Sequence, residues 1–210
     1  MVEIELKSKD LTEYVYLALN KNRNTPLYDE DIEEIEDITL DALDFLDEPT
    51  DTTIYDLIFF TNLKTCMIVN MKITENEIDL LNKLESIESI QFTNCNLPRG
   101  KKLKLNASYV IIDNCNNFAL DSINEMCNVK KLRIVNCENL NVAGIEKMES
   151  IAELYLQNIN IEDVSFVTNL HSLEYLNLNG TKIKKSTNVL DGLKIKIDHE
   201  DKNYIYDVEN

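Results

Sequence analysis

Hydrophobic residues return at fixed spacings along most of the chain, and the clearest instance is the segment Leu173–Ile183. Leucines occupy its first, fourth and sixth positions, and Thr181 and Ile183 continue the same set. The alternation from Leu176 to Leu178 has the period of two that is typical of a strand with one buried face. The wider spacings on either side predict turns. We therefore expect a short strand here whose leucines point into a core.

The same frame occurs six more times upstream of this segment. Successive frames are offset by 28, 24, 20, 22, 22 and 22 residues. The residues that begin the inward-pointing set of each strand are Ile38, Cys66, Ile90, Val110, Leu132, Leu154 and Leu176. One such repeat cannot bury its own apolar face, but stacked repeats bury it against their neighbours and share a ladder of backbone hydrogen bonds. The spacing therefore predicts a solenoid whose parallel strands form one sheet.

The segments between the strands mostly return to a helical spacing. Thr74 and Glu77 have the spacing of a capping box before an apolar stripe. Similar helical spacings join Leu120, Ile123 and Met126, and Ile145 and Met148. The segment 96–106 contains Pro98 and Gly100, so we expect it to be extended instead.

The two ends of the chain depart from the frame. Residues 9–20 have an apolar stripe at helical spacing, and Asp10 with Glu13 has the spacing of a capping box, so we expect a helix with Asp10 as its N-cap. A short acidic helical turn is expected at residues 28–34. Leu190–Ile197 suggests one last strand, and Tyr204–Val208 suggests a closing strand.

The frames resemble the pattern LxxLxLxx(N/C)xL of leucine-rich repeat proteins over residues 35–183, and residues 10–43 resemble the helical cap of bacterial internalin-like proteins. The resemblance implies an α/β leucine-rich repeat solenoid with a concave parallel β-sheet and short helices or turns on its convex side. Within this one domain we expect an N-terminal helical cap at residues 1–34. About seven repeats at residues 35–188 and a C-terminal cap at residues 189–210 would follow.

The formal net charge of −17 is concentrated near the N-terminus. Thirteen acidic residues, and no lysine or arginine, lie between Arg23 and Lys64. A field of one sign repels nucleic acid and attracts basic surfaces, so we expect no direct binding of nucleic acid. A solvated face that keeps the protein in solution is the alternative interpretation. The acids that we select as candidates for binding a basic partner are Asp37, Asp41, Asp44, Asp47 and Glu48.

Two residue types recur at fixed positions just after the strands. Cys95, Cys115 and Cys137 share an inward position, where we expect buried thiols that act as small apolar side chains. The preceding position is asparagine in five frames, at Asn70, Asn94, Asn114, Asn136 and Asn158. These amides would either satisfy backbone groups of the turn or line a binding edge. The five cysteines contain no CxxC, so we predict neither a disulfide framework nor a metal site.

Side chains between the inward residues of each strand point to the concave face. Three tyrosines there surround Lys131 and Arg133, and Tyr and Arg are residue types that anchor interfaces. Exposed strand positions also favour tyrosine for its β-propensity, which is the alternative interpretation. The candidate partner-binding residues of this face are Gln91, Tyr109, Ile111, Asp113, Lys131, Arg133, Glu153, Tyr155, Gln157, Tyr175 and Asn177.

Nothing in the sequence indicates an enzyme. Its two histidines are His171, which has no nucleophile nearby in the frame, and His199. No phosphate-binding, zinc-protease or dinucleotide motif occurs, so we predict no catalytic residue, no metal and no cofactor. The first residues lack the apolar stretch of a secretion signal, and no run approaches the length of a membrane span. We therefore expect a cytoplasmic protein without membrane contact.

The leading hypothesis is a non-enzymatic leucine-rich repeat module that binds a protein partner. A candidate role is the inhibition of a basic, nucleic-acid-handling protein, in the manner of an immunity protein. In one alternative, the acidic N-terminal region mimics nucleic acid and occupies a basic groove. In the other, the protein is a general adaptor that uses its concave face. The oligomeric state is left open.

Overall fold

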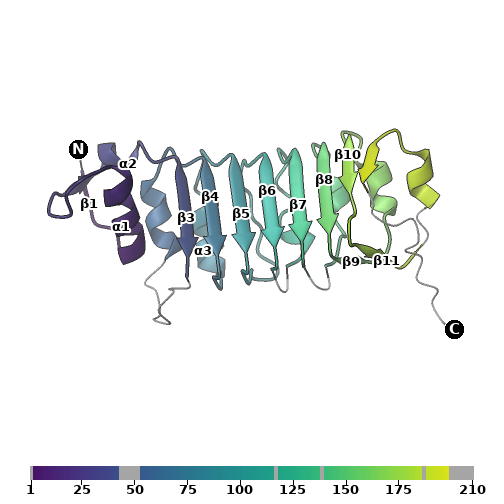
Figure 1. Ribbon diagram of the computed structural model, residues 1–210, viewed down its shortest axis with the longest axis horizontal. Coiled ribbons are helices and arrows are strands. Elements are labelled where there is room, and N and C mark those ends of the chain that lie inside the picture. The colour runs from purple at the N-terminus through teal and green to yellow at the C-terminus, as the bar shows by residue number, and fades with distance from the viewer. Residues whose placement is uncertain (1, 43–52, 116–117, 138–139, 186–187, 199–210) are drawn as a thin grey trace.

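A parallel sheet of eight strands forms the centre of the protein (Figure 1). The computed structural model describes residues 2–42, 53–115, 118–137, 140–185 and 188–198. The strands of the sheet are β3 (Asp37–Asp41), β4 (Thr65–Val69), β5 (Ser89–Thr93), β6 (Tyr109–Asp113), β7 (Lys131–Val135), β8 (Glu153–Gln157), β10 (Tyr175–Asn177) and β12 (Lys196–Asp198). They lie in this order across the sheet. A second, two-stranded parallel sheet pairs β9 (Asn160–Ile161) with β11 (Lys182–Ile183).

The register of the large sheet confirms the repeat frame. Cys66 pairs with Ile38 on one side and with Ile90 on the other. The same row continues through Val110, Leu132, Leu154 and Leu176 on successive strands. It then reaches Ile197 in β12, which confirms the last strand expected within Leu190–Ile197. The closing strand expected at Tyr204–Val208 lies outside the described residues.

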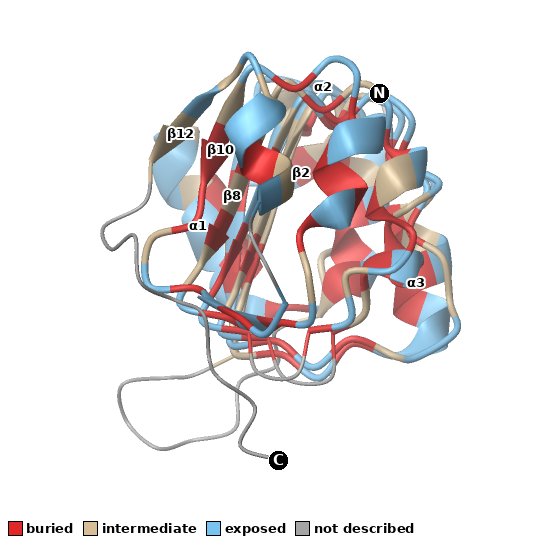
Figure 2. Ribbon diagram, turned by 90° about the vertical axis from the view of Figure 1, so that its right-hand side faces the viewer, coloured by how far each residue is buried: buried red, intermediate tan, exposed pale blue. Residues whose placement is uncertain are grey.

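The inward side chains of the strands form one continuous core with apolar residues of the connecting segments. Figure 2 shows the buried positions gathered between the sheet and the segments that cross behind it. Leu132, Leu154 and Leu176 have no exposed surface. Complete burial of a leucine side chain stabilises a fold by about 1.5–3 kcal/mol, so an uninterrupted row of such residues fixes the stacking of the repeats.

In the part of the chain that the structure describes, the convex side carries one helix and several 3₁₀ turns. The helix is α3 (Glu75–Leu81), and its capping box is confirmed, because Thr74 Oγ1 accepts from the Glu77 amide at 3.3 Å and Glu77 Oε2 accepts from the Thr74 amide at 2.7 Å. The turns are η1 (Ile54–Phe59), η2 (Leu120–Ser122), η3 (Ile145–Lys147), η4 (Ser165–Asn169) and η5 (Asn188–Gly192). Residues 96–106 contain no helix, in agreement with the extended path predicted there.

The helical spacing after β6 and after β7 produces only the short turns η2 and η3. The reason lies at their first residues. Ala119 and Gly144 stand where Thr74 stands before α3, and neither supplies a side-chain cap. Without a cap, the first amides of a helix lack a partner, and a short segment does not propagate.

Four small elements lie beyond β3 at the N-terminal end of the sheet (Figure 1). They are β1 (Glu3–Ile4), α1 (Lys9–Ala18), β2 (Leu27–Tyr28) and α2 (Asp29–Ile32). Leu11 and Val15 of α1 are buried in the common core, and the Tyr14 hydroxyl donates to the Asp37 carbonyl at 2.8 Å. No helix among the described residues is long and apolar enough to cross a membrane.

The N-cap of α1 is Ser8, so the expectation of Asp10 is wrong. Ser8 Oγ accepts from the Leu11 amide at 3.2 Å, and Asp10 lies in the first turn of the helix. The start of the helix is set by a distant residue, since the Ser8 amide donates to Asp56 Oδ2 at 2.7 Å. A negative charge in a first turn is favourable in its own right, which accounts for the position of Asp10.

Asp56 is a structural residue and not part of the solvated acidic surface. It is 1% exposed, and its Oδ2 also accepts from the Lys7 amide at 2.9 Å. The two hydrogen bonds join the segment before α1 to η1, 48 and 49 residues away. The sequence placed Asp56 among thirteen acids of one field, and nothing in its local pattern distinguished it.

Replacing Asp56 with asparagine is expected to lower the free energy of unfolding by about 1–3 kcal/mol, because a neutral amide accepts less strongly and brings its own buried donors. The matched control is Glu149→Gln, which removes the same charge at an exposed position. Urea denaturation followed by circular dichroism measures both. Equal midpoints for the two variants would contradict the role assigned to Asp56.

Candidate partner-binding surface

The concave face, which is the face of the sheet that points away from the core, carries side chains in rows that follow the register. The first row consists of Asp37, Thr65, Ser89, Tyr109, Lys131, Glu153, Tyr175 and Lys196. The second row consists of Thr39, Met67, Gln91, Ile111, Arg133, Tyr155, Asn177 and Asp198. Asp113 and Gln157 lie in a third row. All the predicted concave residues therefore lie together on β5 to β10.

Lys131 is held in place by an ion pair and two aromatic rings. Its Nζ atom lies 2.9 Å from Glu153 Oε2 and within 5.3 and 5.1 Å of the ring centroids of Tyr109 and Tyr155. The Tyr155 hydroxyl donates to the same Glu153 oxygen at 2.9 Å. The register explains this geometry, because Lys131 lies directly between Tyr109 and Glu153 in the first row.

Tyr175 and the last strand extend this arrangement. The rings of Tyr155 and Tyr175 are 5.1 Å apart and tilted by 50°, and the Tyr175 hydroxyl donates to Asp198 Oδ2 at 2.5 Å. Lys196 lies over the Tyr175 ring at 5.2 Å, and Asn177 Nδ2 donates to the Tyr175 hydroxyl at 3.0 Å. Lys196 and Asp198 are absent from the predicted set. Alternation around Ile195 and Ile197 was the signal that could have found them.

The pKa values follow from these contacts. The hydrogen bond with Glu153 raises the pKa of Lys131, and the same bond is the main cause that lowers the pKa of Glu153. Burial, followed by the bond to Glu153, raises the pKa of Tyr155, and the bond to Asp198 raises the pKa of Tyr175. At neutral pH the surface therefore carries paired opposite charges between neutral tyrosines.

Arg133 differs from the other cations of the face. It is exposed, and within the described part of the chain its guanidinium group makes no hydrogen bond or ion pair. Its neighbours across the ladder are Ile111 on β6 and Tyr155 on β8. Further toward the N-terminal end, β4 and β5 present only uncharged side chains on this face.

The acidic candidates have mixed roles. Asp37 and Asp41 lie at the two ends of β3, and Asp41 Oδ1 accepts from Asn70 Nδ2 at 2.7 Å. Asp44, Asp47 and Glu48 lie outside the described residues. The two described candidates, Asp37 and Asp41, are therefore separated by the length of β3.

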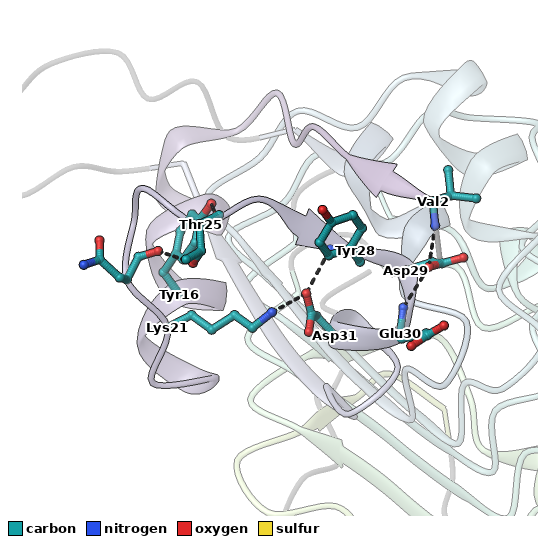
Figure 3. A network of polar contacts seen from close by, with 9 residues as sticks. Val2, Tyr16, Lys21, Thr25, Tyr28, Asp29, Glu30 and Asp31 are labelled. Atoms are coloured by element: carbon teal, nitrogen blue, oxygen red, sulfur yellow. Dashed lines mark hydrogen bonds and ion pairs between the residues drawn. The ribbon is translucent and has the colours of Figure 1, made fainter.

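Other acids of the same interval form bonds within the N-terminal region (Figure 3). Asp29 accepts from the Val2 amide at 2.8 Å, and this bond lowers the pKa of Asp29. Asp31 pairs with Lys21 and accepts from the Tyr28 amide at 2.9 Å. The bond with Lys21 is the main cause that lowers the pKa of Asp31. Part of the acidic field is thus used to hold this region together.

The asparagine column is a ladder of amides. All five residues have positive φ, from 49° to 57°, as is typical of asparagine in a turn. The prediction that their amides satisfy backbone groups of the turn is wrong, because Asn94 Nδ2 donates to Asn70 Oδ1 at 2.9 Å and Asn158 Nδ2 donates to Asn136 Oδ1 at 3.1 Å. The ladder is interrupted once, where Asn136 Nδ2 donates to Asp113 Oδ1 at 3.0 Å instead of to Asn114. Strands about 4.8 Å apart bring equivalent amides within reach of each other, so this pairing was favoured over local bonds.

Gly180 occupies the ladder position in the next frame, with a φ of +70°. A Cβ atom at this position would lie 2.0 Å from Asn158 Oδ1. The carbonyl end of the Asn158 amide therefore fills the space where another side chain would begin, and the ladder ends here.

The cysteine column is buried, as predicted, and its thiols also donate hydrogen bonds. The Sγ atoms of Cys95, Cys115 and Cys137 lie 3.2, 3.5 and 3.8 Å from the carbonyl oxygens of Ile68, Phe92 and Ile112. Thr181 occupies the same position and donates to the Leu156 carbonyl at 2.6 Å. Four repeats thus have a small donor at this position, whereas Met71 and Ile159 occupy it in two others. Cys66 lies elsewhere in the core, where burial raises the pKa of its thiol to about 12.

Comparison with known proteins places this architecture among leucine-rich repeat proteins. Neither a family model nor a curated protein matches the chain. Among solved structures, internalin C2 of Listeria monocytogenes is similar over 91% of this chain and 93% of its own, with 16% identity and a TM-score of 0.56. The protein thus has an internalin-like leucine-rich repeat fold.

Two further internalins of Listeria monocytogenes are also similar, each with 13% identity. InlF covers 96% of this chain and 77% of its own, with a TM-score of 0.37. InlP covers 93% and 72%, with a TM-score of 0.38.

The Gly180→Ala variant is expected to lose at least about 1–2 kcal/mol of unfolding free energy, from the left-handed backbone and the collision with Asn158. Gly192→Ala is the matched control, since a Cβ there meets no atom within 4 Å. Adding Asn158→Gly removes the collision, so Gly180→Ala should cost less in that background. An equal cost in both backgrounds, measured by urea denaturation, would show that the contact is unimportant.

The Lys131–Glu153 pair makes stability depend on pH. The pKa of Glu153 is lowered in the folded protein, so the stabilisation is present above the unfolded value of 4.5 and is lost as the pH falls below it. The difference in unfolding free energy between the wild type and Glu153→Gln should shrink in that acidic range. It should be small, because both side chains are more than a third exposed. A difference that stays constant during acidification would rule the pair out as its source.

Proposed function

We propose that this protein is a non-enzymatic module that binds a protein partner through its concave face. The observation that carries the proposal is the concave cluster, defined as Tyr109, Lys131, Arg133, Tyr155 and Tyr175. Its side chains come from four adjacent strands, and hydrogen bonds and ring contacts hold the tyrosines and Lys131 in place, whereas the Arg133 guanidinium is exposed. Aromatic side chains that are already ordered lose little freedom on binding, and tyrosine and arginine are residue types that anchor interfaces.

Four of the five cysteines are buried, which argues against a nucleophilic role for them, whereas Cys127 is exposed. The thiols of Cys95, Cys115 and Cys137 face the core and donate to backbone carbonyls, where a substrate does not reach them. His171 lies in the turn before β10 and is exposed. The cytoplasmic location expected from the sequence stays a prediction.

The second candidate is an acidic N-terminal surface that engages a basic partner, either as an inhibitor or as a mimic of nucleic acid. The exposed residues Glu33, Glu34 and Asp37 favour it. Against it, Asp29, Asp31 and Asp56 of the same field are bound within the protein. The concave cluster therefore has the stronger support.

Two sets of substitutions distinguish the candidates in a pull-down from the native cell with a tagged protein. If the concave cluster binds, Tyr155→Ala and Arg133→Glu should each reduce recovery of the partner at least about tenfold, the effect of about 1.4 kcal/mol. Glu34→Lys and Asp37→Lys should leave recovery unchanged. Lys130→Glu is the control for charge reversal, since Lys130 is exposed and precedes the concave position of Lys131.

The opposite pattern would support the acidic surface. In that case Glu34→Lys and Asp37→Lys abolish recovery while the concave variants keep it. Circular dichroism of each variant separates a loss of binding from a loss of folding.

A further inference from the structure

Arg133 is a central cation of the concave cluster, and its guanidinium has no hydrogen-bond or ion-pair partner among the described residues. Its strand, β7, lies in the middle of the sheet. The charged groups nearest to it in the rows have partners of their own. Lys131 and Tyr155 share Glu153, Asn136 donates to Asp113 at 3.0 Å, and the Tyr175 hydroxyl donates to Asp198.

The surroundings of Arg133 mean that any partner that covers the face also buries its positive charge. Ile111 and Tyr155 flank it across the ladder, and both are half-buried. A partner seated over these side chains removes water from the guanidinium. An unpaired charge in such a position is strongly unfavourable, whereas a carboxylate can accept two parallel hydrogen bonds from the planar guanidinium group.

The acidic N-terminal region does not cancel the preference of Arg133 for a carboxylate. Four strand spacings separate β7 from β3, which is about 19 Å at about 4.8 Å per strand. The Debye length at physiological salt is about 8 Å, so the acids beyond β3 are largely screened at Arg133. The local charge, and not the net charge of −17, decides which group docks there.

We propose that the concave cluster binds a protein segment that presents an aspartate or glutamate carboxylate to Arg133. This proposal rests on the proposed function and specifies the chemistry of the partner. It opposes the basic partner that the net charge suggests. A phosphate would also fit an arginine, but a single arginine on this face does not provide the broad basic surface that nucleic acid needs.

Selection from a displayed library of short linear peptides tests the proposal, at a salt concentration of about 0.15 M, where the distant acids are screened. The wild type should enrich peptides with an acidic residue at one fixed position. Arg133→Glu should bind these peptides at least about tenfold more weakly and enrich lysine or arginine at that position instead. Arg133→Lys should bind with intermediate affinity, because lysine keeps the charge but lacks the two-pronged geometry. Lys130→Glu should behave like the wild type.

The other outcomes would overturn the carboxylate proposal, the proposed function of the concave face, or both. Peptides that lose binding on Tyr155→Ala but show no acidic position would refute the carboxylate and leave the concave face as the binding surface. Binding of a single-stranded oligonucleotide that depends on Arg133, without acidic peptides, would replace the protein segment with nucleic acid. A library that returns nothing sensitive to Tyr155→Ala or Arg133→Glu would overturn both proposals. Each variant is first checked for wild-type circular dichroism.

Discussion

Parallel pairing of equivalent residues on neighbouring repeats is the constraint on which the rest of the structure depends. Each strand pairs with the next in the same register, so a residue such as Leu132 lies beside its counterparts Val110 and Leu154 on the neighbouring strands. Burial of that row fixes the register, because a slip by one residue would turn every inward side chain to the solvent. The same register also aligns the residues at every other position of the repeat, whatever their chemistry.

Three different columns follow from this alignment. At the inward position after the strand, thiols and one hydroxyl reach a carbonyl of the preceding repeat. At the turn, amides of asparagine pair with each other. On the concave face the column mixes tyrosine with opposite charges, and Lys131 becomes the shared neighbour of Tyr109, Tyr155 and Glu153. Stacking of the repeats thus arranges these columns side by side on one continuous surface.

The sequence was informative wherever a local period determines structure. The row from Ile38 to Leu176 and the face that carries Arg133 follow from spacing alone. It was uninformative where a contact joins distant residues. The start of α1 at Ser8 depends on Asp56, 48 residues away, and no local pattern separates that buried carboxylate from its exposed neighbours. The contacts of the Cys95 and Cys115 thiols with carbonyls of the preceding repeat were likewise not predictable, because those carbonyls lie 27 and 23 residues away.

The contrast between global and local charge has a consequence for the choice of partner. Net charge acts at long range and steers approach, but screening confines it to about 8 Å at physiological salt. Beside the concave cluster the acids Glu153 and Asp198 already have partners, whereas the Arg133 guanidinium makes no hydrogen bond or ion pair among the described residues. An acidic protein can therefore present a surface that prefers an acidic group, provided that the surface lies several strands away from its own acids. The sheet supplies that distance, since each added repeat moves the cluster one strand further from the N-terminal region.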